Sequence, residues 1–279
     1  MTSFREVPET EAAGEIAAIY DEIRRTYAVP YVSSLFRHLA IYPGLLPWAW
    51  QTLRPALLSG AAQHLAWQRI NISGLLPLPP LSYKALADLG INDAGLASIR
   101  TICHSFVRVS PVNLIVAAAL AGLLGQKPAG TGAADSLVPL KPTALPAALP
   151  AVPDMVPEIA MTPGTRAALA VFETELAGET FTPGLYRILA HWPGFLVHLA
   201  ATLGPRLRDP AVLDACEGVA ERVIALAPSV LAALEPPVAP APLTPSDTQS
   251  VLAAIRTYRG TSPQMASFGT LILRSLPKV

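Results

Sequence analysis

The sequence predicts an all-α protein made of two tandem helical repeats that pack together as an internal pseudo-dimer. Apolar residues recur at helical spacing along most of the chain, and no segment has the alternating pattern of a β-strand. The chain also matches itself after a shift of 150 positions. With 279 residues, it can bury a core in one large domain or in two smaller ones.

The internal match is densest where residues 35–57 fall on residues 185–207, with 11 identities in 23 positions and no gap. Weaker matches flank this stretch in the same order in both halves, among them two Ser-Pro pairs, Ser110-Pro111 and Ser262-Pro263. A duplication explains this order. It predicts a first helical repeat, a linker rich in Pro and Ala, and a second helical repeat, at residues 1–126, 127–154 and 155–279.

Each repeat is expected to form a series of helices. In the first repeat we expect them at residues 13–25, 31–40, 48–70, 83–89, 93–107 and 111–124. Asp93 is the expected N-cap of its helix, and Pro111 is expected in the first turn of the next helix, a position that proline favours. One repeat alone would expose a large apolar face, which the two copies bury against each other around a pseudo-two-fold axis.

The composition argues against nucleic acid or a membrane surface as a partner. The 20 basic and 20 acidic residues cancel, so no net field attracts a polyanion. Only 14% of the residues are charged, 52% are hydrophobic, and the mean hydropathy is +0.42. This apolar balance fits a large internal interface and is compatible with a homodimer.

The ends and the cysteines indicate a cytoplasmic protein. The N-terminal residues are polar and acidic, which does not resemble a signal peptide. The longest apolar run, residues 114–124, is shorter than the roughly 20 residues of a membrane span. Cys103 and Cys216 match no zinc or CxxC pattern, so we expect two reduced, buried thiols.

No motif for a metal or a cofactor is present, and none is expected to bind. The five histidines form no HExxH pattern, and the chain has no glycine-rich nucleotide loop. Two arginines recur in both halves, as the pairs Arg37/Arg187 and Arg100/Arg256. An arginine in an apolar helix suits a carboxylate substrate or a structural ion pair, and its repetition favours the structural role.

Several motifs, in the same order along nearly the whole chain, resemble the DehI-type (group I) 2-haloacid dehalogenases. They are Gly14-Glu15-Ile16, Tyr20-Asp21-Glu22-Ile23-Arg24, Val29-Pro30-Tyr31-Val32, Pro43-Gly44-Leu45-Leu46-Pro47, Ala49-Trp50, Ala190-His191-Trp192-Pro193 and Leu243-Thr244-Pro245. The resemblance implies a duplicated all-α fold with a site between the repeats. It also implies a direct mechanism, in which an aspartate acts as general base on a water that attacks and inverts the halogen-bearing carbon.

Transferring the family's positions onto this chain leaves the general base without a carboxylate. The aspartate position falls on Leu185 or its neighbour Gly184, neither of which can take a proton. The position of an asparagine that holds the water falls on Ser110. The resemblance places pocket aromatics at Tyr31, Ser34 and Tyr258, the second of which is serine here.

Two hypotheses follow. The first is a hydrolase that acts on the carbon–halide bond of 2-haloalkanoic acids, with Glu179 as the nearest carboxylate that could replace the base. The second is a non-catalytic protein that binds a small apolar carboxylic acid between the repeats. A third reading, a relative of the carboxymuconolactone decarboxylases, requires a CxxC-type motif that this sequence lacks. The missing base favours the second hypothesis, and we expect hydrolysis of 2-chloropropionate to be absent or very slow.

Overall fold

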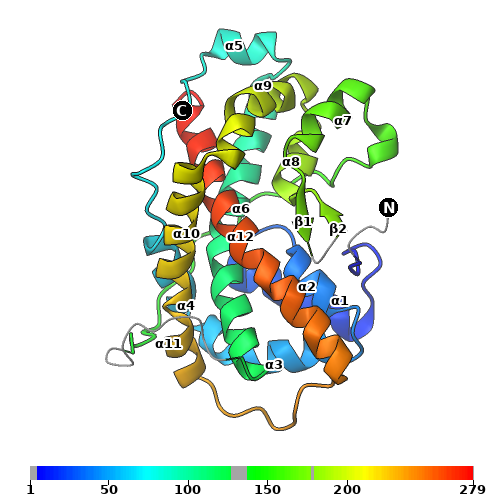
Figure 1. Cartoon of the computed structure of the whole chain (residues 1–279), viewed down its shortest axis with the longest axis vertical. Helices are drawn as coiled ribbons and strands as arrows, with labels where there is room; N and C mark the ends of the chain where they lie inside the picture. The colour runs from blue at the N-terminus through cyan, green and yellow to red at the C-terminus, as the bar shows by residue number, and fades with distance from the viewer. Residues whose placement is uncertain (1–4, 127–136, 177–178, 279) are drawn as a thin grey trace.

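The computed structural model describes residues 5–126, 137–176 and 179–278 (Figure 1). The protein is all-α apart from one short β-ribbon. In chain order the elements are α1 (Gly14–Tyr27), α2 (Ser34–Leu39), α3 (Leu45–Leu58), α4 (Ala61–Gln68), α5 (Tyr83–Asp88), α6 (Asp93–Leu123), η1 (Glu158–Ala160), α7 (Pro163–Ala170), β1 (Thr174–Leu176), β2 (Glu179–Phe181), α8 (Gly184–Leu189), α9 (Pro193–Leu203), η2 (Gly204–Arg208), α10 (Pro210–Ile224), α11 (Ala227–Ala232) and α12 (Pro245–Ser275).

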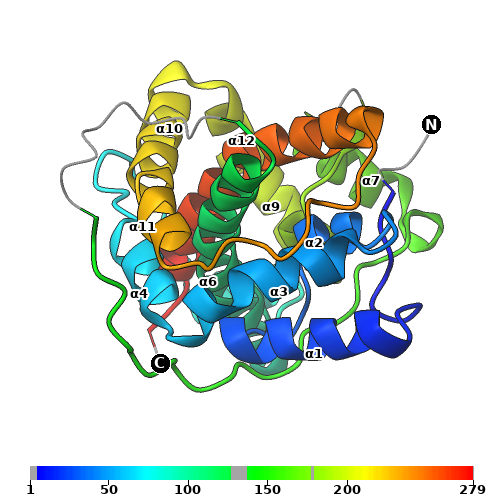
Figure 2. The same cartoon turned by 90° about the horizontal axis from the view of Figure 1, so that it is seen from below.

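Two long helices, α6 and α12, cross at the centre of the molecule and make its most extensive helix contact (Figures 1 and 2). Each has 31 residues and an internal proline 18 positions after its first residue, Pro111 in α6 and Pro263 in α12. The expected break between residues 93–107 and 111–124 is therefore wrong. Proline removes one helical hydrogen bond, at a cost of about 3 kcal/mol, but burial of the residues around Pro111 outweighs that cost and the helix continues.

Two helix boundaries also differ from the expectation. Asn92, not Asp93, is the N-cap of α6, and its side-chain oxygen accepts a hydrogen bond from the Gly95 amide at 2.8 Å. The helix expected at residues 48–70 is divided into α3 and α4 at Gly60, which has a φ of +70°. A side chain at Gly60 would also collide with the carbonyl oxygen of Thr143, so the linker packs closely here.

The β-ribbon was not expected from the sequence. Strands β1 and β2 pair antiparallel, with Thr174 opposite Phe181 and Glu175 opposite Thr180. Three residues per strand are too few to show an alternating pattern above the background. The ribbon delivers the chain directly to the start of α8, which borders the functional site described below.

The core consists of two apolar clusters, and each draws on both predicted repeats. The first contains α1, α2, α3 and the C-terminal half of α6, together with α10 and the N-terminal half of α12. The second contains the N-terminal half of α6 with α8, α9 and the C-terminal half of α12. The two clusters therefore meet at the middle of the crossing helices.

The order of helices follows the sequence match. Helices α2 and α8 have six residues each and begin 150 positions apart, and α6 and α12 begin 152 positions apart. These correspondences support an internal repeat. The internal repeat itself, its pseudo-two-fold relation and the proposed domain boundaries stay predictions.

Helix α6 is long and apolar enough to cross a membrane by length and composition, with a mean hydropathy of 1.8 in its most apolar window. However, 67% of that window is buried inside the protein, and the central helix of a globular fold passes the same test.

The part of the linker at residues 137–154 has no regular secondary structure. It contacts the helices through backbone hydrogen bonds, for example from Thr143 N–H to Ser59 O at 2.8 Å.

Candidate functional site

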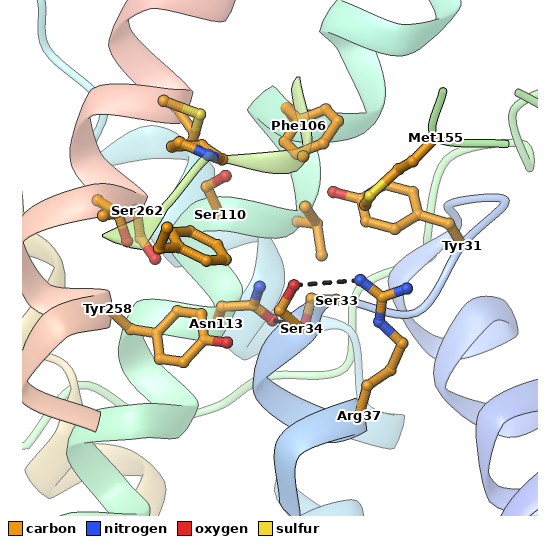
Figure 3. A pocket seen from close by; sticks show the side chains of 16 residues that line it. Tyr31, Ser33, Ser34, Arg37, Phe106, Ser110, Asn113, Met155, Tyr258 and Ser262 are labelled. Atoms are coloured by element: carbon orange, nitrogen blue, oxygen red, sulfur yellow. Dashed lines mark hydrogen bonds between the residues drawn. The ribbon is translucent and has the colours of Figure 1, made fainter. Parts of the chain in front are cut away.

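An inner cavity lies where the two core clusters meet, between the middles of α6 and α12 (Figure 3). Its volume is about 50 Å³, which at roughly 10–15 Å³ per water holds about three to five waters or a ligand of a few non-hydrogen atoms. It is lined by Tyr31, Ser33, Ser34, Arg37, Phe106, Val109, Ser110, Asn113, Met155, Phe181, Pro183, Gly184, Tyr258, Thr261, Ser262 and Met265.

Most of these residues form pairs across the two halves of the chain. The pairs at an offset of 150 are Tyr31/Phe181, Ser33/Pro183 and Ser34/Gly184, and those at 152 are Phe106/Tyr258, Val109/Thr261, Ser110/Ser262 and Asn113/Met265. The pairs differ in polarity. Ser33, Ser34 and Asn113 are polar in the first half, whereas their counterparts in the second half are apolar. The reverse holds for Phe106 and Val109, whose counterparts Tyr258 and Thr261 are polar. The cavity thus has a polar wall near Arg37 and a set of apolar residues from the second half, the apolar wall, which consists of Phe181, Pro183, Gly184 and Met265.

Arg37 is the only cationic side chain among the described residues that line the cavity. One terminal nitrogen of its guanidinium donates a hydrogen bond to Ser34 Oγ at 3.1 Å (Figure 3) and lies 3.2 Å from a carboxylate oxygen of Glu6. The Nε atom of Arg37 is buried and has no hydrogen-bond partner. The guanidinium therefore keeps donor capacity that a bound carboxylate can use.

Two buried tyrosines add hydroxyl donors. Burial raises the pKa of Tyr31 well above its ordinary value, an effect that the nearby charge of Arg37 opposes. Burial likewise raises the pKa of Tyr258, with a smaller increase from Glu6. The hydroxyl of Tyr31 has no hydrogen-bond partner, and that of Tyr258 makes no bond of ordinary geometry although Ser34 is close. Both phenols stay protonated, so they can donate to an anion.

Asn113 is a polar lining residue that the sequence reasoning missed. It lies one helical turn after Ser110 in α6, and its Oδ1 accepts a hydrogen bond from Ser33 Oγ at 3.2 Å. Because Oδ1 accepts this hydrogen bond, the amide nitrogen is the group of Asn113 that can donate to another partner. The one-turn spacing from Ser110 was a usable signal, because residues three apart on a helix share a face.

A second, larger hollow of about 430 Å³ lies next to the inner cavity. It is bordered by the N-terminal segment at residues 6–10 and by the end of the linker at residues 152–155. Tyr31, Arg37 and Met155 line both spaces and therefore separate them. Figure 3 shows the ring of Tyr31 beside Met155, with the guanidinium of Arg37 next to them. The two spaces are therefore neighbours, with these three side chains between them.

The structure brings four of the candidate residues, Tyr31, Ser34, Ser110 and Tyr258, to the inner cavity. The fifth candidate residue, Leu185, does not lie where we expected it. It is fully buried in the second core cluster and does not line the cavity, whereas its neighbour Gly184 does. Adjacent residues on a helix point in different directions, which is why only one of the two can face the cavity.

No described residue that lines the inner cavity carries a carboxylate. The backbone of Glu179 begins β2, two residues before the lining residue Phe181, and its side chain lies outside the described part of the structure. Three described acids border the outer hollow instead, and they are Glu6, Glu9 and Asp154.

Neither a metal centre nor a reactive thiol emerges from the described residues. No group of three His, Cys, Asp or Glu side chains there could hold a metal ion. Cys103 and Cys216 are buried and free, and burial raises the pKa of Cys103 to about 12. A thiol with such a pKa is un-ionised at neutral pH and is a poor nucleophile.

Comparison with known proteins shows that the chain is similar to 2-haloacid dehalogenases. The family model described as "Halocarboxylic acid dehydrogenase DehI" matches residues 30–145. A configuration-inverting 2-haloacid dehalogenase of Alcaligenes xylosoxydans xylosoxydans is 30% identical over 46% of this chain and 43% of its own length. An (R)-2-haloacid dehalogenase of Rhizobium sp. (strain NHG3) is 27% identical over 80% of this chain and 86% of its own. The chain thus spans less than half of the first relative and most of the second.

Solved structures extend the likeness to the whole fold. A D-2-haloacid dehalogenase mutant superposes with a TM-score of 0.74 at 21% identity, covering 97% of this chain and 95% of that one. A complex of a D-2-haloacid dehalogenase mutant with D-2-CPA gives a TM-score of 0.70 at 20% identity, covering 97% and 94%. At these identities the comparison shows a shared fold, and chemistry has to be argued from the site.

Proposed function

This chain belongs to the DehI-type 2-haloacid dehalogenase family, and on that premise we propose that it binds a small 2-substituted carboxylic acid in the inner cavity without hydrolysing it efficiently. One observation carries the proposal: the cavity offers a cation and several hydrogen-bond donors but no carboxylate among the residues described. The donors suit a bound anion, and the missing carboxylate removes the group that would activate water.

The two walls of the cavity favour one orientation of the ligand. The carboxylate faces Arg37, Ser34 and the phenols, because these groups donate hydrogen bonds to an anion. The substituent at carbon 2 lies against the apolar wall, which includes Phe181 and Met265. The volume of about 50 Å³ favours a small acid.

The chemistry of direct displacement needs a base within hydrogen-bond reach of the attacking water. Serine, threonine and neutral tyrosine hydroxyls are poor bases at neutral pH, and an arginine cannot accept a proton. General-base assistance is typically worth about 10²–10⁴-fold. We therefore expect halide release slower by about this factor than with a cavity that holds a carboxylate.

A second candidate function is hydrolysis with Glu179 as the base. The position of its backbone, two residues from Phe181 in β2, favours this candidate over the other acids of the chain. In that case Glu179 would take the proton of a water bound beside Asn113 and Ser110, and the halide would leave toward the apolar wall. The variant Glu179→Gln, which removes the base and keeps the shape, separates the two candidates.

The experiment combines binding and turnover in one sample. Purified wild-type protein is titrated with each enantiomer of 2-chloropropionate in a calorimeter, and released chloride is then measured in the recovered sample. We expect saturable binding of at least one enantiomer, with chloride at the level of a protein-free control. Arg37→Met, which removes the charge and keeps an unbranched side chain, should abolish the binding.

Three outcomes contradict parts of the proposal. Chloride release that survives Glu179→Gln would show that another group acts as the base. Release that Glu179→Gln abolishes would establish the second candidate function. Absence of binding by folded wild-type protein would remove the proposed function itself.

A further inference from the structure

The cation of the inner cavity already has an anionic neighbour. Glu6 reaches Arg37 from the outer hollow, with 3.2 Å between a carboxylate oxygen and a guanidinium nitrogen. Both side chains are largely buried, with exposed fractions of 20% for Glu6 and 11% for Arg37. Arg37 is the one cation among the described residues that line the inner cavity. A carboxylate beside it therefore occupies part of the group that the ligand carboxylate would use.

The contact between Glu6 and Arg37 is an ion pair without a hydrogen bond. The closest oxygen of Glu6, Oε2, is buried and has no hydrogen-bond partner, and Nε of Arg37 is also buried and unpaired. The two groups attract each other but lack the two parallel hydrogen bonds of a bidentate arginine–carboxylate pair. Both groups therefore keep unused hydrogen-bonding capacity. A free carboxylate, which can orient itself, is able to use that capacity.

We propose that Glu6 is an internal stand-in for the ligand carboxylate, and that it lowers the affinity of the cavity for small acids by competing for Arg37. This inference rests on the proposed function, because it assumes that the ligand carboxylate binds Arg37. In the unliganded protein Glu6 neutralises the guanidinium. When an acid binds, the side chain of Glu6 moves away into the outer hollow, which has room for it.

The segment that carries Glu6 is held in place by other contacts. The amide of Val7 donates to the carbonyl of Arg37 at 3.0 Å, and the hydroxyl of Tyr20 donates to the carbonyl of Val7 at 3.0 Å. Glu9 accepts a hydrogen bond from the amide of Val32 at 2.7 Å and pairs with Arg24. The Glu6 side chain is therefore not needed to anchor the segment, and it can leave Arg37 without unfolding it.

The charge of Glu6 also reaches the inside of the cavity. It contributes to the raised pKa of Tyr258, on α12 across the cavity from Arg37. A ligand carboxylate placed between Arg37 and Tyr258 feels the same negative charge. Two carboxylates on one guanidinium repel each other, so removal of one strengthens the binding of the other. A neutral ligand of the same shape feels no such effect.

The test compares three proteins and two ligands by calorimetry. The variants are Glu6→Gln, which removes the charge with little change in shape, and Glu11→Gln, which removes the same charge from an exposed side chain of the same segment. The ligands are 2-chloropropionate and the neutral 2-chloropropionamide. We expect Glu6→Gln to bind the acid at least about fivefold more tightly than the wild type. The affinity of Glu11→Gln for the acid and that of every protein for the amide should stay within about twofold of the wild-type value.

Each alternative result has one meaning. Equal or weaker binding of the acid by folded Glu6→Gln overturns the inference and leaves the proposed function standing. An equal gain in Glu11→Gln overturns it too, because net charge alone would then explain the effect. No binding of the acid by any of the three proteins removes the proposed function and the inference together. Urea unfolding of each variant checks the fold, and Glu6→Ala, expected to show the same gain, replaces Glu6→Gln if that variant is unfolded.

Discussion

At the start of α8, two neighbouring residues lie in opposite surroundings. Gly184 lines the inner cavity, and a side chain there would first meet the ends of Met155 and Phe106. Leu185 has no exposed surface and packs in the second core cluster. Both residues are candidates for the position that holds the general base in the family. Only Gly184 offers a route for a carboxylate into the cavity.

The variant Gly184→Asp is therefore expected to gain hydrolysis of 2-chloropropionate. It places a carboxylate in the cavity, where general-base assistance is worth about 10²–10⁴-fold. The side chain of Met155, whose end would lie 2.8 Å from the new Cβ atom, has to shift and is flexible enough to do so. The measurement is chloride release from each enantiomer, with Gly184→Asn as the control that keeps the size and lacks the base. Equal rates for the two variants would contradict this expectation.

The same substitution at the next position should act on stability instead. Leu185→Asp places an unpaired carboxylate in the apolar core, which typically costs several kcal/mol. It is therefore not a valid test of activity. The sequence alone could not separate the two positions, because the direction of a side chain depends on where the helix starts.

At the scale of elements, sequence patterns predicted some features of the long helices α6 and α12 and not others. The matched pairs Ser110-Pro111 and Ser262-Pro263 both lie inside long helices, with each proline 18 positions after the first residue of its helix. The inference that proline starts a new helix at residue 111 was wrong, because local propensity yields to the burial of a helix packed on all sides. The cap of α6 was misplaced by one residue, since both Asn and Asp are good N-caps.

The capping assignment can be measured directly. Asn92→Ala removes the hydrogen bond to the Gly95 amide and should lower the free energy of unfolding by about 1 kcal/mol. Asn92→Asp, which keeps an acceptor in place, should leave it nearly unchanged. Urea unfolding of both variants provides the comparison. If Asp93→Ala costs as much as Asn92→Ala, Asp93 is the true cap and the assignment fails.

At the scale of the whole molecule, the cavity depends on the union of the two predicted repeats. Each apolar cluster takes residues from both halves, and the cavity lies where the clusters meet. The sequence could predict the all-α class and four lining residues, because helical spacing and the family motifs are local signals. It could not predict which residues from distant segments meet, as Ser33 and Asn113 do. A homodimer stays a prediction.

Buried tyrosines give the whole molecule a predictable response to high pH. Burial raises the pKa of Tyr27, Tyr31, Tyr186 and Tyr258 above the value of about 10 in the unfolded chain. Below about pH 10 these tyrosines are protonated in both the folded and the unfolded protein, so they contribute no pH dependence to the free energy of unfolding. Above it only the unfolded chain releases protons, and stability falls by about 1.4 kcal/mol per pH unit for each tyrosine.

We therefore expect the urea midpoint to begin to fall above about pH 8.5, where the Cys103 thiol ionises in the unfolded chain but not in the folded protein, and to fall steeply between about pH 10 and about pH 11, where the tyrosines add their larger effect. Tyrosine ionisation, followed by absorbance, should coincide with unfolding. Ionisation of most tyrosines in a protein that is still folded would show that these hydroxyls reach solvent. The phenols of the cavity would then not be the permanent donors that the account requires.

The most direct test of the central claim is a crystal structure of the protein grown with 2-bromopropionate, in which anomalous scattering locates bromine. We expect one bromine site against the apolar wall of the inner cavity, bonded to an intact ligand whose carboxylate lies within hydrogen-bond reach of Arg37. Bromine confined to other sites, or lactate with free bromide in the cavity, would contradict it. The first result would mean that the cavity is not the binding site, and the second that a base acts on the ligand which is absent from the described lining of the cavity.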